Sequence, residues 1–181
     1  VRTARSRNTP PAARLPETGS PRHFGERTMN QKQKQDRYRR IREQLAELFT
    51  KTGDPVARMA TAVALLHHKM PQYFWTGFYR LVDGVLTVGP YQGPLACQVL
   101  QAHTGVCWAG IDRGEPVVVA DVHAFPGHIA CDSRSRSEIV VPLRDAAGRI
   151  VGVLDVDSDQ PTAFDEADRE GLLPIVAMIF A

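Results

Sequence analysis

Two neighbouring segments near the C-terminus, residues 137–143 and 149–157, constrain the fold more than any other part of the chain. Both are rich in Val, Ile and Leu, and residues 145–148 between them have the composition of a turn. Short apolar and β-branched runs on either side of a turn are typical of paired antiparallel strands. We therefore expect a hairpin here, whose apolar surface the rest of the chain must cover.

The register of this hairpin decides which side chains meet, because side chains alternate between the two faces of a strand. An even-length turn would place Leu143 opposite Ile150 and Glu138 opposite Asp155. Glu138 would then share a face with Asp155 and Asp157. The same face would carry three apolar residues toward the turn, namely Val140, Val151 and Val153. Adjacent carboxylates repel one another, so the pattern leaves two interpretations open: a solvated outer face, or the floor of a pocket that is acidic at one end.

The remaining segments predict helices at both ends and a second hairpin. Apolar residues recur every three or four positions in residues 36–49 and again after the N-cap Asp54, which predicts two amphipathic helices. Asp83-Gly84 is a strong hairpin signal between residues 73–82 and 85–88. A short helix over 104–114, a strand over 117–120, a long loop over 121–136 and a helix from about Asp165 complete the prediction. The expected fold class is α+β, with flanking N- and C-terminal helices around a central antiparallel sheet.

Residues 1–28 differ in composition from the rest, with six Arg, two Glu and four Pro. Such a segment buries too little apolar surface to offset the entropy of ordering, so we expect a disordered basic leader or tail before a single domain over residues 29–181. The whole chain carries +2 and the first 28 residues contribute +4, so this domain carries −2. No nucleic-acid partner is expected. No membrane span is expected either, because the longest apolar runs fall short of about 20 residues.

Trp75, Gly77 and Tyr79 point to one face of the first predicted strand. The missing side chain at Gly77 would leave space for a small group between two aromatic rings. Core packing is the simpler interpretation of these three residues. The alternative is the wall of a pocket that accepts a methyl group or a sulfur-bearing chain.

The three cysteines, Cys97, Cys107 and Cys131, form no CxxC pair and no disulfide framework, which favours a reducing, cytoplasmic setting. Cys97 has the surroundings of a small buried hydrophobe. Cys131 lies in a polar loop near His128, which, like free backbone N–H groups, could lower the pKa of the thiol from about 8.5 toward neutrality. The competing use of these residues is an irregular zinc site made of His123, His128 and Cys131.

Taken together, these segments resemble the free methionine-R-sulfoxide reductases, which are single-domain enzymes built on the GAF fold. The resemblance runs from about Asp36 to the end of the chain. It rests on the motifs Trp75-Thr76-Gly77-Phe78-Tyr79, Gly89-Pro90-Tyr91-Gln92-Gly93 with Ala96-Cys97, Gly105-Val106-Cys107, Asp121-Val122-His123, Gly127-His128-Ile129-Ala130-Cys131-Asp132, Ser137-Glu138-Ile139-Val140-Val141-Pro142-Leu143 and Gly152-Val153-Leu154-Asp155-Val156-Asp157-Ser158. General GAF sensor domains share the hairpins, whereas the three cysteines with the Gly-His-Ile-Ala-Cys-Asp run are specific to the reductases.

The resemblance implies a role for each candidate residue. Cys131 matches the catalytic cysteine, Cys107 the resolving position, and Cys97 a further thiol whose part varies among members. The substrate site matches the acidic cluster Glu138, Asp155 and Asp157 and the aromatic wall Trp75 and Tyr79. Two departures from the family are Trp108, where Gly is common and which puts the mobility of the resolving loop in doubt, and the end of the chain at Ala181, early for the last helix.

The implied reaction is the reduction of free L-methionine-(R)-sulfoxide to L-methionine. Cys131 would become a sulfenic acid and then a disulfide, which thioredoxin would reduce with electrons from NADPH via thioredoxin reductase. No metal and no bound cofactor are expected, and the protein would act against oxidative stress in the cytoplasm. A homodimer is compatible with the family.

Two other functions remain open at this stage. A GAF binding module that senses a small ligand or a redox state would need an output element, and these residues show no coiled-coil linker or DNA-binding motif. A peroxide-reducing thiol enzyme would use a reactive and a resolving cysteine, but it has no need of three carboxylates that bind an ammonium group.

Overall fold

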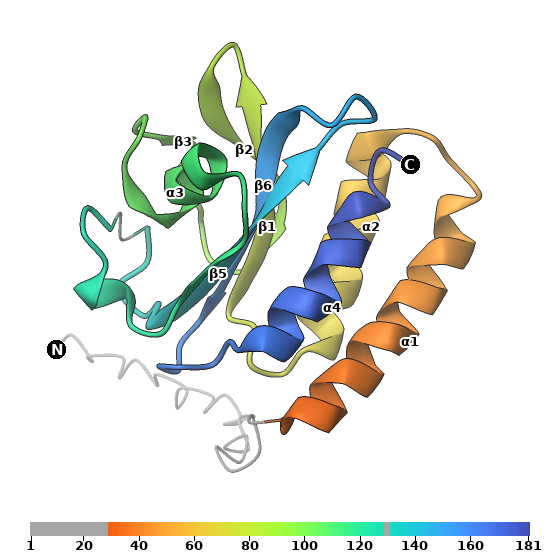
Figure 1. The fold of residues 1–181 in the computed structure, drawn as a ribbon, viewed down its shortest axis with the longest axis horizontal. Helices are drawn as coiled ribbons and strands as arrows, with labels where there is room; N and C mark the ends of the chain where they lie inside the picture. Colours follow the sequence, from red (N-terminus) through yellow and green to blue (C-terminus); the bar gives the residue numbers. More distant parts are fainter. Residues whose placement is uncertain (1–28, 129–130) are drawn as a thin grey trace, which may run out of the picture.

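The computed structural model describes residues 29–128 and 131–181, and Figure 1 shows their arrangement. The predicted leader, residues 1–28, lies outside the described residues. In chain order the elements are α1 (Gln31–Phe49), α2 (Pro55–Lys69), β1 (Trp75–Val82), β2 (Val85–Gln92), β3 (Val99–Leu100), α3 (Gly105–Arg113), β4 (Val117–Val119), the 3-10 helix η1 (Val122–Ala124), β5 (Ser137–Arg144), β6 (Ile150–Ser158) and α4 (Glu166–Ala177). The predicted α+β fold class is confirmed.

The strands of the described part form one antiparallel sheet in the order β3-β2-β1-β6-β5-β4. Helices α2 and α4 lie against one face of this sheet, with α1 packed on their outer side, and α3 lies against the other face (Figure 1). The molecule therefore has two apolar cores: a larger one between the sheet and the three helices, and a smaller one between the sheet and α3. None of the helices in the described part combines the length and apolar composition that a membrane span requires.

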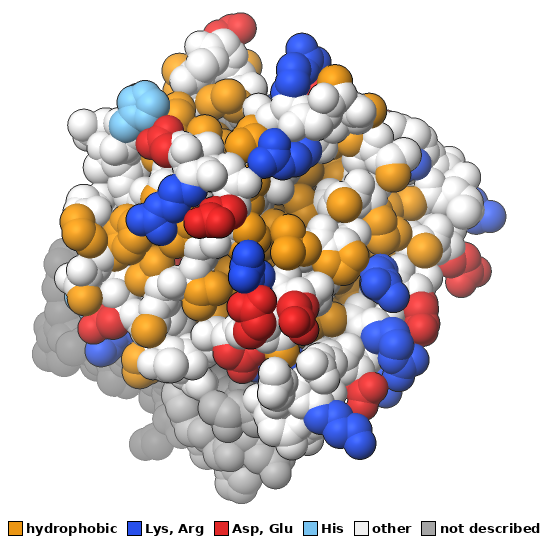
Figure 2. Space-filling model, viewed as in Figure 1, with side chains coloured by type: hydrophobic (Ala, Val, Ile, Leu, Met, Phe, Trp, Pro, Cys, Tyr) orange, Lys and Arg blue, Asp and Glu red, His pale blue; other side chains and the backbone are white. Residues whose placement is uncertain are grey.

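Charged side chains are interspersed on the surface. On the face displayed in Figure 2, Lys and Arg side chains lie among Asp and Glu side chains, with apolar and other groups between them. The charges on this face are therefore mixed in sign and form no large patch of one sign.

Local signals explain where α1 and α2 begin. Asn30 forms a capping box with Gln33, in which both hydrogen bonds measure 2.9 Å. This cap starts α1 five residues before the predicted boundary at residue 36. Asp54 accepts a hydrogen bond from the Ala57 backbone N–H at 2.8 Å, and Pro55 takes the first helical position of α2. That start is the one that the sequence predicts.

The hairpin of β1 and β2 forms as predicted. Asp83 and Gly84 both have positive φ values, 50° and 80°, as a two-residue type I′ turn requires. Strand β2 runs on past the predicted end at residue 88, and the edge strand β3 was not predicted. Gly89 and Pro90 lie inside β2. Both residue types are rare in strands, and for this reason the predicted strand ended before them.

The register predicted for the last hairpin is wrong by two residues. Glu138 pairs with Asp157, and Asp155 pairs with Val140. Asp145 shapes the turn, since its carboxylate accepts backbone hydrogen bonds from Ala147 at 3.0 Å and from Arg149 at 2.9 Å. A shift of two residues preserves the side-chain faces, so the three acids still lie on one face of the sheet.

An irregularity next to this turn changes the position of one predicted residue. Leu143 pairs with Gly152 and Arg144 with Ile150, which leaves Val151 as an extra residue. A Cβ at Gly152 would lie 2.3 Å from the Tyr79 carbonyl oxygen, so only Gly fits where β6 approaches β1 this closely. Val151 therefore turns toward the larger core instead of joining Val140 and Val153 on the pocket face.

A buried polar cluster connects α1 to α4 next to the larger core. Lys34 forms ion pairs with Asp168 and with Asp165, the latter at 3.0 Å. The Tyr38 hydroxyl donates to Asp168 at 2.7 Å and lies 2.6 Å from the Tyr73 hydroxyl. Lys34 is only 4% exposed and Asp168 is fully buried. The buried charges of Lys34 and Asp168 therefore each need the opposite charge of the other to offset the cost of burial.

Removing the cation of this cluster should destabilise the fold. We expect Lys34→Met to lower the free energy of unfolding by about 3 kcal/mol, because Asp168 would remain buried without its ion pair. Urea denaturation followed by circular dichroism measures the effect. Arg39→Met is the control: Arg39 forms exposed ion pairs with Asp36 and Glu43, and its loss should change stability by about 0.5 kcal/mol or less. Equal losses in the two variants would show that the buried pair has no special weight.

Candidate active site

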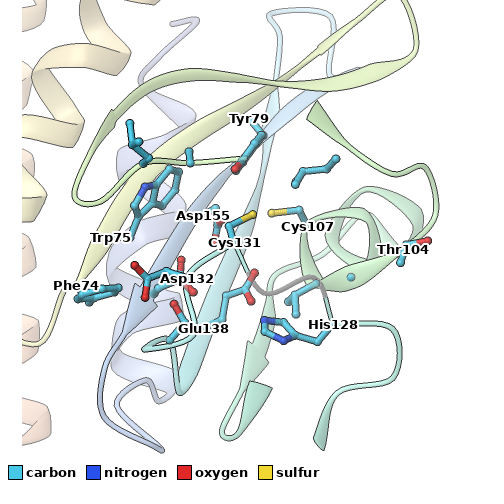
Figure 3. A pocket seen from close by; sticks show the side chains of 17 residues that line it. Phe74, Trp75, Tyr79, Thr104, Cys107, His128, Cys131, Asp132, Glu138 and Asp155 are labelled. Atoms are coloured by element: carbon cyan, nitrogen blue, oxygen red, sulfur yellow. The ribbon is translucent and has the colours of Figure 1, made fainter. Parts of the chain in front are cut away.

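A pocket of about 580 Å³, counted out to its open mouth, lies on the face of the sheet that α3 covers. Strands β1, β5 and β6 form its floor and one wall, the start of α3 forms the opposite wall, and the loop after η1 closes one side. Figure 3 shows Trp75 and Tyr79 on one side and Cys107 and His128 on the other, with Asp155 between them. The pocket therefore gathers residues that are as far apart in the chain as β1 and β6.

The floor of the pocket is acidic. Glu138 is 5% exposed and Asp155 is 6% exposed, and Asp157 is half-buried beside them. Cys107 reaches the same place from α3, so that its sulfur and one carboxylate oxygen each from Glu138 and Asp155 lie within 4.8 Å of one another. The strand faces that the sequence predicts thus bring the three acids together, although with the shifted register described above.

Burial sets the ionisation of these acids. The pKa of Glu138 is raised well above its usual value, first by burial and then by the charge of Asp155. Burial and the charge of Asp157 likewise raise the pKa of Asp155. Burial raises the pKa of Asp157 to about 7, although a hydrogen bond with Ser135 opposes the shift. The cluster therefore retains protons near neutral pH and can donate one.

One oxygen of the cluster lacks a partner. Asp155 Oδ1 is buried and accepts no hydrogen bond from the described residues. A buried acceptor of this kind gains stability when a ligand supplies a donor. An ammonium group or a protonated oxygen of a bound molecule would meet this requirement.

The aromatic wall is continuous. The rings of Trp75 and Tyr79 stack with their centroids 5.8 Å apart, and Tyr91 also stacks on Trp75, at 5.5 Å. A Cβ at Gly77 would lie 2.4 Å from Cη2 of Trp75, so the indole itself fills the space above this glycine. The predicted gap between the two rings is therefore absent, and the pair forms a single apolar surface facing the acids.

The structure joins two of the three cysteines. Cys97 and Cys131 form a disulfide with their Cα atoms 5.5 Å apart, and Cys107 is a buried free thiol. The prediction that Cys97 is a buried hydrophobe is wrong, because the loop after β2 brings it to Cys131. Burial and the charges of Asp155 and Glu138 raise the pKa of Cys107. Cys107 is therefore held as a thiol, the less reactive form.

The loop that carries Cys131 has its own electrostatics. His128 lines the pocket, and its pKa is lowered by burial and then by His123, which keeps the ring neutral. Asp132 is held by Arg134, whose hydrogen bonds lower the pKa of this carboxyl to about 2. The guanidinium of Arg134 also lies over the Phe74 ring, 4.7 Å from its centroid. Phe74 and Asp132 line the pocket, so this contact closes the rim next to Cys131.

The predicted alternative of a zinc site receives no support. Among the described residues, metal-ligand spacing is found for Cys107, Glu138 and Asp155, a set that excludes the proposed His123, His128 and Cys131. The two histidine rings lie 6.3 Å apart, edge to face.

Trp108, the departure from the family pattern, is buried behind the pocket. It is 5% exposed, its Nε1 donates to the Leu100 carbonyl at 3.5 Å, and its ring lies 4.9 Å from that of His103. These contacts anchor α3, so Cys107 belongs to a fixed wall of the pocket and not to a loose loop.

Sequence analysis missed several pocket residues. Phe74, Thr104 and Ser135 line the pocket but lie outside the predicted motifs or beside them. Ser135 could have been found from its position, because it stands two residues before the predicted strand that carries Glu138. Phe74 precedes Trp75 directly, and it reaches the rim only through the tertiary contact with Arg134.

Comparisons with known proteins agree with this geometry. A family model for the GAF domain matches residues 54–179. The chain is 44% identical over 141 residues to protein YtsP of Bacillus subtilis, covering 77% of this chain and 86% of that protein. It is 42% identical over 124 residues to the free methionine-R-sulfoxide reductase of Escherichia coli, covering 68% and 74%. The X-ray structure of the Neisseria meningitidis free methionine-R-sulfoxide reductase in complex with its substrate matches 78% of this chain and 85% of that chain, with a TM-score of 0.75 and 42% identity.

The buried acids should make the ligand-free protein less stable as the pH rises. The folded protein keeps protons that the unfolded chain releases above about pH 4, so stability is lost up to about pH 7 for Asp157. We expect Asp157→Asn to be more stable than the unsubstituted protein at pH 7.5 by about 1 kcal/mol or more, and this advantage should shrink toward pH 4.

Urea denaturation of the disulfide form at both pH values measures this difference. Glu115→Gln is the control, because it removes an exposed carboxylate outside the pocket, and its stability relative to the unsubstituted protein should hardly vary with pH. A stability advantage of Asp157→Asn that is the same at pH 4 and pH 7.5 would contradict the raised pKa.

Proposed function

The chain belongs to the GAF-domain family and, within it, to the free methionine-R-sulfoxide reductases, and we propose that it reduces free L-methionine-(R)-sulfoxide to L-methionine. It is thus an oxidoreductase. The observation that supports this function best is the Cys97–Cys131 disulfide beside a pocket whose floor carries three carboxylates with raised pKa values.

The first step needs a nucleophile and a proton donor. The thiolate of Cys131 attacks the sulfoxide sulfur, and a carboxylic acid from the cluster of Glu138, Asp155 and Asp157 protonates the sulfoxide oxygen. A bond forms between the Cys131 sulfur and the substrate sulfur as the sulfur–oxygen bond breaks and the protonated oxygen leaves as water. A water molecule then attacks the Cys131 sulfur, the bond between the two sulfurs breaks with its electron pair left on the substrate, and Cys131 becomes a sulfenic acid. The substrate sulfur gains two electrons and the Cys131 sulfur loses two. Methionine is released.

The second step uses Cys97. Its sulfur attacks the sulfenic acid, forms the disulfide, and releases the oxygen as water. The pairing of Cys97 with Cys131 supports this order. Cys107, the position first expected to resolve the sulfenic acid, is held as a thiol by the carboxylates around it. We therefore assign Cys107 to the pocket wall.

An external dithiol closes the cycle. Its thiolate forms a bond with the Cys131 sulfur, the electron pair of the old disulfide leaves on Cys97, and a second thiol then displaces Cys131. The exposed position of Cys131 supports attack at that sulfur. We propose thioredoxin as this reductant, with NADPH via thioredoxin reductase as the electron source and the reducing cytoplasm as the compartment. The steps require no metal and no bound organic cofactor.

The same acids explain why the substrate is a free amino acid. One carboxyl group serves as the proton donor, and the remaining negative charge can hold the substrate ammonium. A methionine within a polypeptide presents a neutral amide there, so it would leave a buried acid without its partner. The methyl group packs on the wall of Trp75 and Tyr79 while the oxygen faces the acids, and inversion at sulfur exchanges these two groups.

Substrate choice tests the proposed function. Under thioredoxin recycling, we expect turnover of free L-methionine-(R)-sulfoxide and little or none of the S epimer. N-acetylated and peptide-bound forms should react slower by a factor on the order of a thousand, because an unpaired buried charge is costly. NADPH consumption measures all four substrates, with hydrogen peroxide as a fifth. Equal rates on the free and N-acetylated R forms would refute ammonium recognition, and peroxide as the best substrate would favour a peroxidase.

The cysteine assignments predict three distinct outcomes. Cys131→Ser should form no methionine. Cys97→Ser should form one equivalent of methionine per protein and then stop, because the sulfenic acid cannot be resolved. Cys107→Ser should continue through many turnovers, even if more slowly.

Methionine formed per protein, with thioredoxin as the reductant, separates these outcomes. Arrest of Cys107→Ser after one equivalent, together with continued cycling of Cys97→Ser, would return the resolving role to Cys107. Full cycling of Cys131→Ser would overturn the mechanism.

A further inference from the structure

The loop that carries Cys97 is attached to the aromatic wall of the pocket by two hydrogen bonds. The Tyr79 hydroxyl donates to the Cys97 carbonyl oxygen at 3.1 Å. Trp75 Nε1 donates to the Pro94 carbonyl oxygen at 3.2 Å. Both donors belong to β1, and both of their rings line the pocket (Figure 3). The residues that face the substrate therefore also hold the backbone of the second cysteine of the disulfide.

The two side chains that donate these hydrogen bonds are held in place by burial and stacking. Tyr79 is 3% exposed and Trp75 is 6% exposed, and their rings stack on each other. Burial and then the charge of Asp155 raise the pKa of Tyr79, so its hydroxyl keeps the proton that it donates. The Cys97 carbonyl thus meets a fixed donor.

The loop is also fixed where it leaves β2. Gly93 has a φ of +123°, and a Cβ at this position would lie 2.8 Å from Cδ1 of Trp75 and 2.9 Å from the Phe74 carbonyl oxygen. Only glycine allows the backbone to approach the indole this closely. The path from Gly93 to Cys97 is therefore determined by contact with the wall.

We propose that the Tyr79 hydroxyl, assisted by Trp75 Nε1, positions Cys97 for its attack on the Cys131 sulfenic acid. This inference rests on the proposed function and adds a second role to the wall, which then controls disulfide formation as well as substrate packing. In the step concerned, the bond between the Cys97 and Cys131 sulfurs forms, the sulfur–oxygen bond of the sulfenic acid breaks, and the oxygen leaves with a proton as water. Tyr79 stays protonated and acts only through the backbone of Cys97.

The chain offers a matched control for the loss of a hydroxyl. Tyr91 also stacks on Trp75, with ring centroids 5.5 Å apart. Its hydroxyl makes no hydrogen bond to the residues that the structure describes, and it lies outside the pocket lining. Tyr91→Phe therefore removes the same atom from the same aromatic stack without touching the loop of Cys97.

The test compares two rates in a single turnover. Reduced protein is mixed with one equivalent of L-methionine-(R)-sulfoxide and quenched over time. Methionine is quantified, and mass spectrometry distinguishes the dimedone-trapped sulfenic acid of Cys131 from the disulfide. We expect Tyr79→Phe to lower the ratio of the disulfide-formation rate to the methionine-formation rate about fivefold, the factor that corresponds to one net hydrogen bond. Tyr91→Phe should leave this ratio within about twofold of the unsubstituted protein.

The outcomes separate this inference from the proposed function. An unchanged ratio in Tyr79→Phe, or an equal fall in Tyr91→Phe, would overturn the positioning role. Failure of the unsubstituted protein to form methionine would instead refute the proposed function. If thermal melting shows that Tyr79→Phe is unfolded, Trp75→Phe decides, since it removes the other donor to the loop, and an unchanged ratio there would also overturn the inference.

Discussion

The rest of the structure has to accommodate three adjacent carboxylates on the sheet, two of them buried and one half-buried. Glu138 and Asp157 face each other across β5 and β6, with Asp155 next to them. Charges in such a position are unfavourable unless they keep protons or gain a cation, and their raised pKa values express that constraint. The opposite face of the same strands compensates, because it packs against α1, α2 and α4 in the larger core. One hairpin thus contributes to the larger core on one face and forms the acidic floor of the pocket on the other.

This division depends on strand register. In β6, Leu154 and Val156 enter the larger core, and Asp155 and Asp157 enter the pocket. A slip of one residue would exchange the two faces completely. The irregularity at Val151 lies at the turn end of the hairpin, several pairs away from the acids. It changes the face of one valine there and leaves the alternation intact where the acids lie.

Features that depend on the local sequence could therefore be predicted. The α+β class, the cap at Asp54, the Asp83-Gly84 turn and the shared face of the acids all follow from spacing along the chain. The pairing of Glu138 with Asp157 did not, because the hydrogen bonds of Asp145 and the close approach at Gly152 set it, and neither is a feature of strand periodicity. The filled space above Gly77 likewise depends on the rotamer of Trp75. The link between Cys97 and Cys131 spans 34 residues, and no local signal at Cys97 distinguished it from a buried apolar residue.

The placement of the three cysteines explains how one site can combine oxidation with proton transfer. A sulfur that reacts with an electrophile must be a thiolate, and a thiolate next to ionised carboxylates is disfavoured. Cys107 lies among the acids, and burial together with their charges raises its pKa and holds it as a thiol, so it is the less reactive of the sulfurs in the proposed mechanism. Cys131 is exposed and is bonded to the half-buried Cys97, which supports the proposal that an external dithiol attacks the pair at Cys131. In the proposed mechanism, proton donation is thus assigned to the buried carboxyl groups and nucleophilic attack to an exposed sulfur that lines the same pocket.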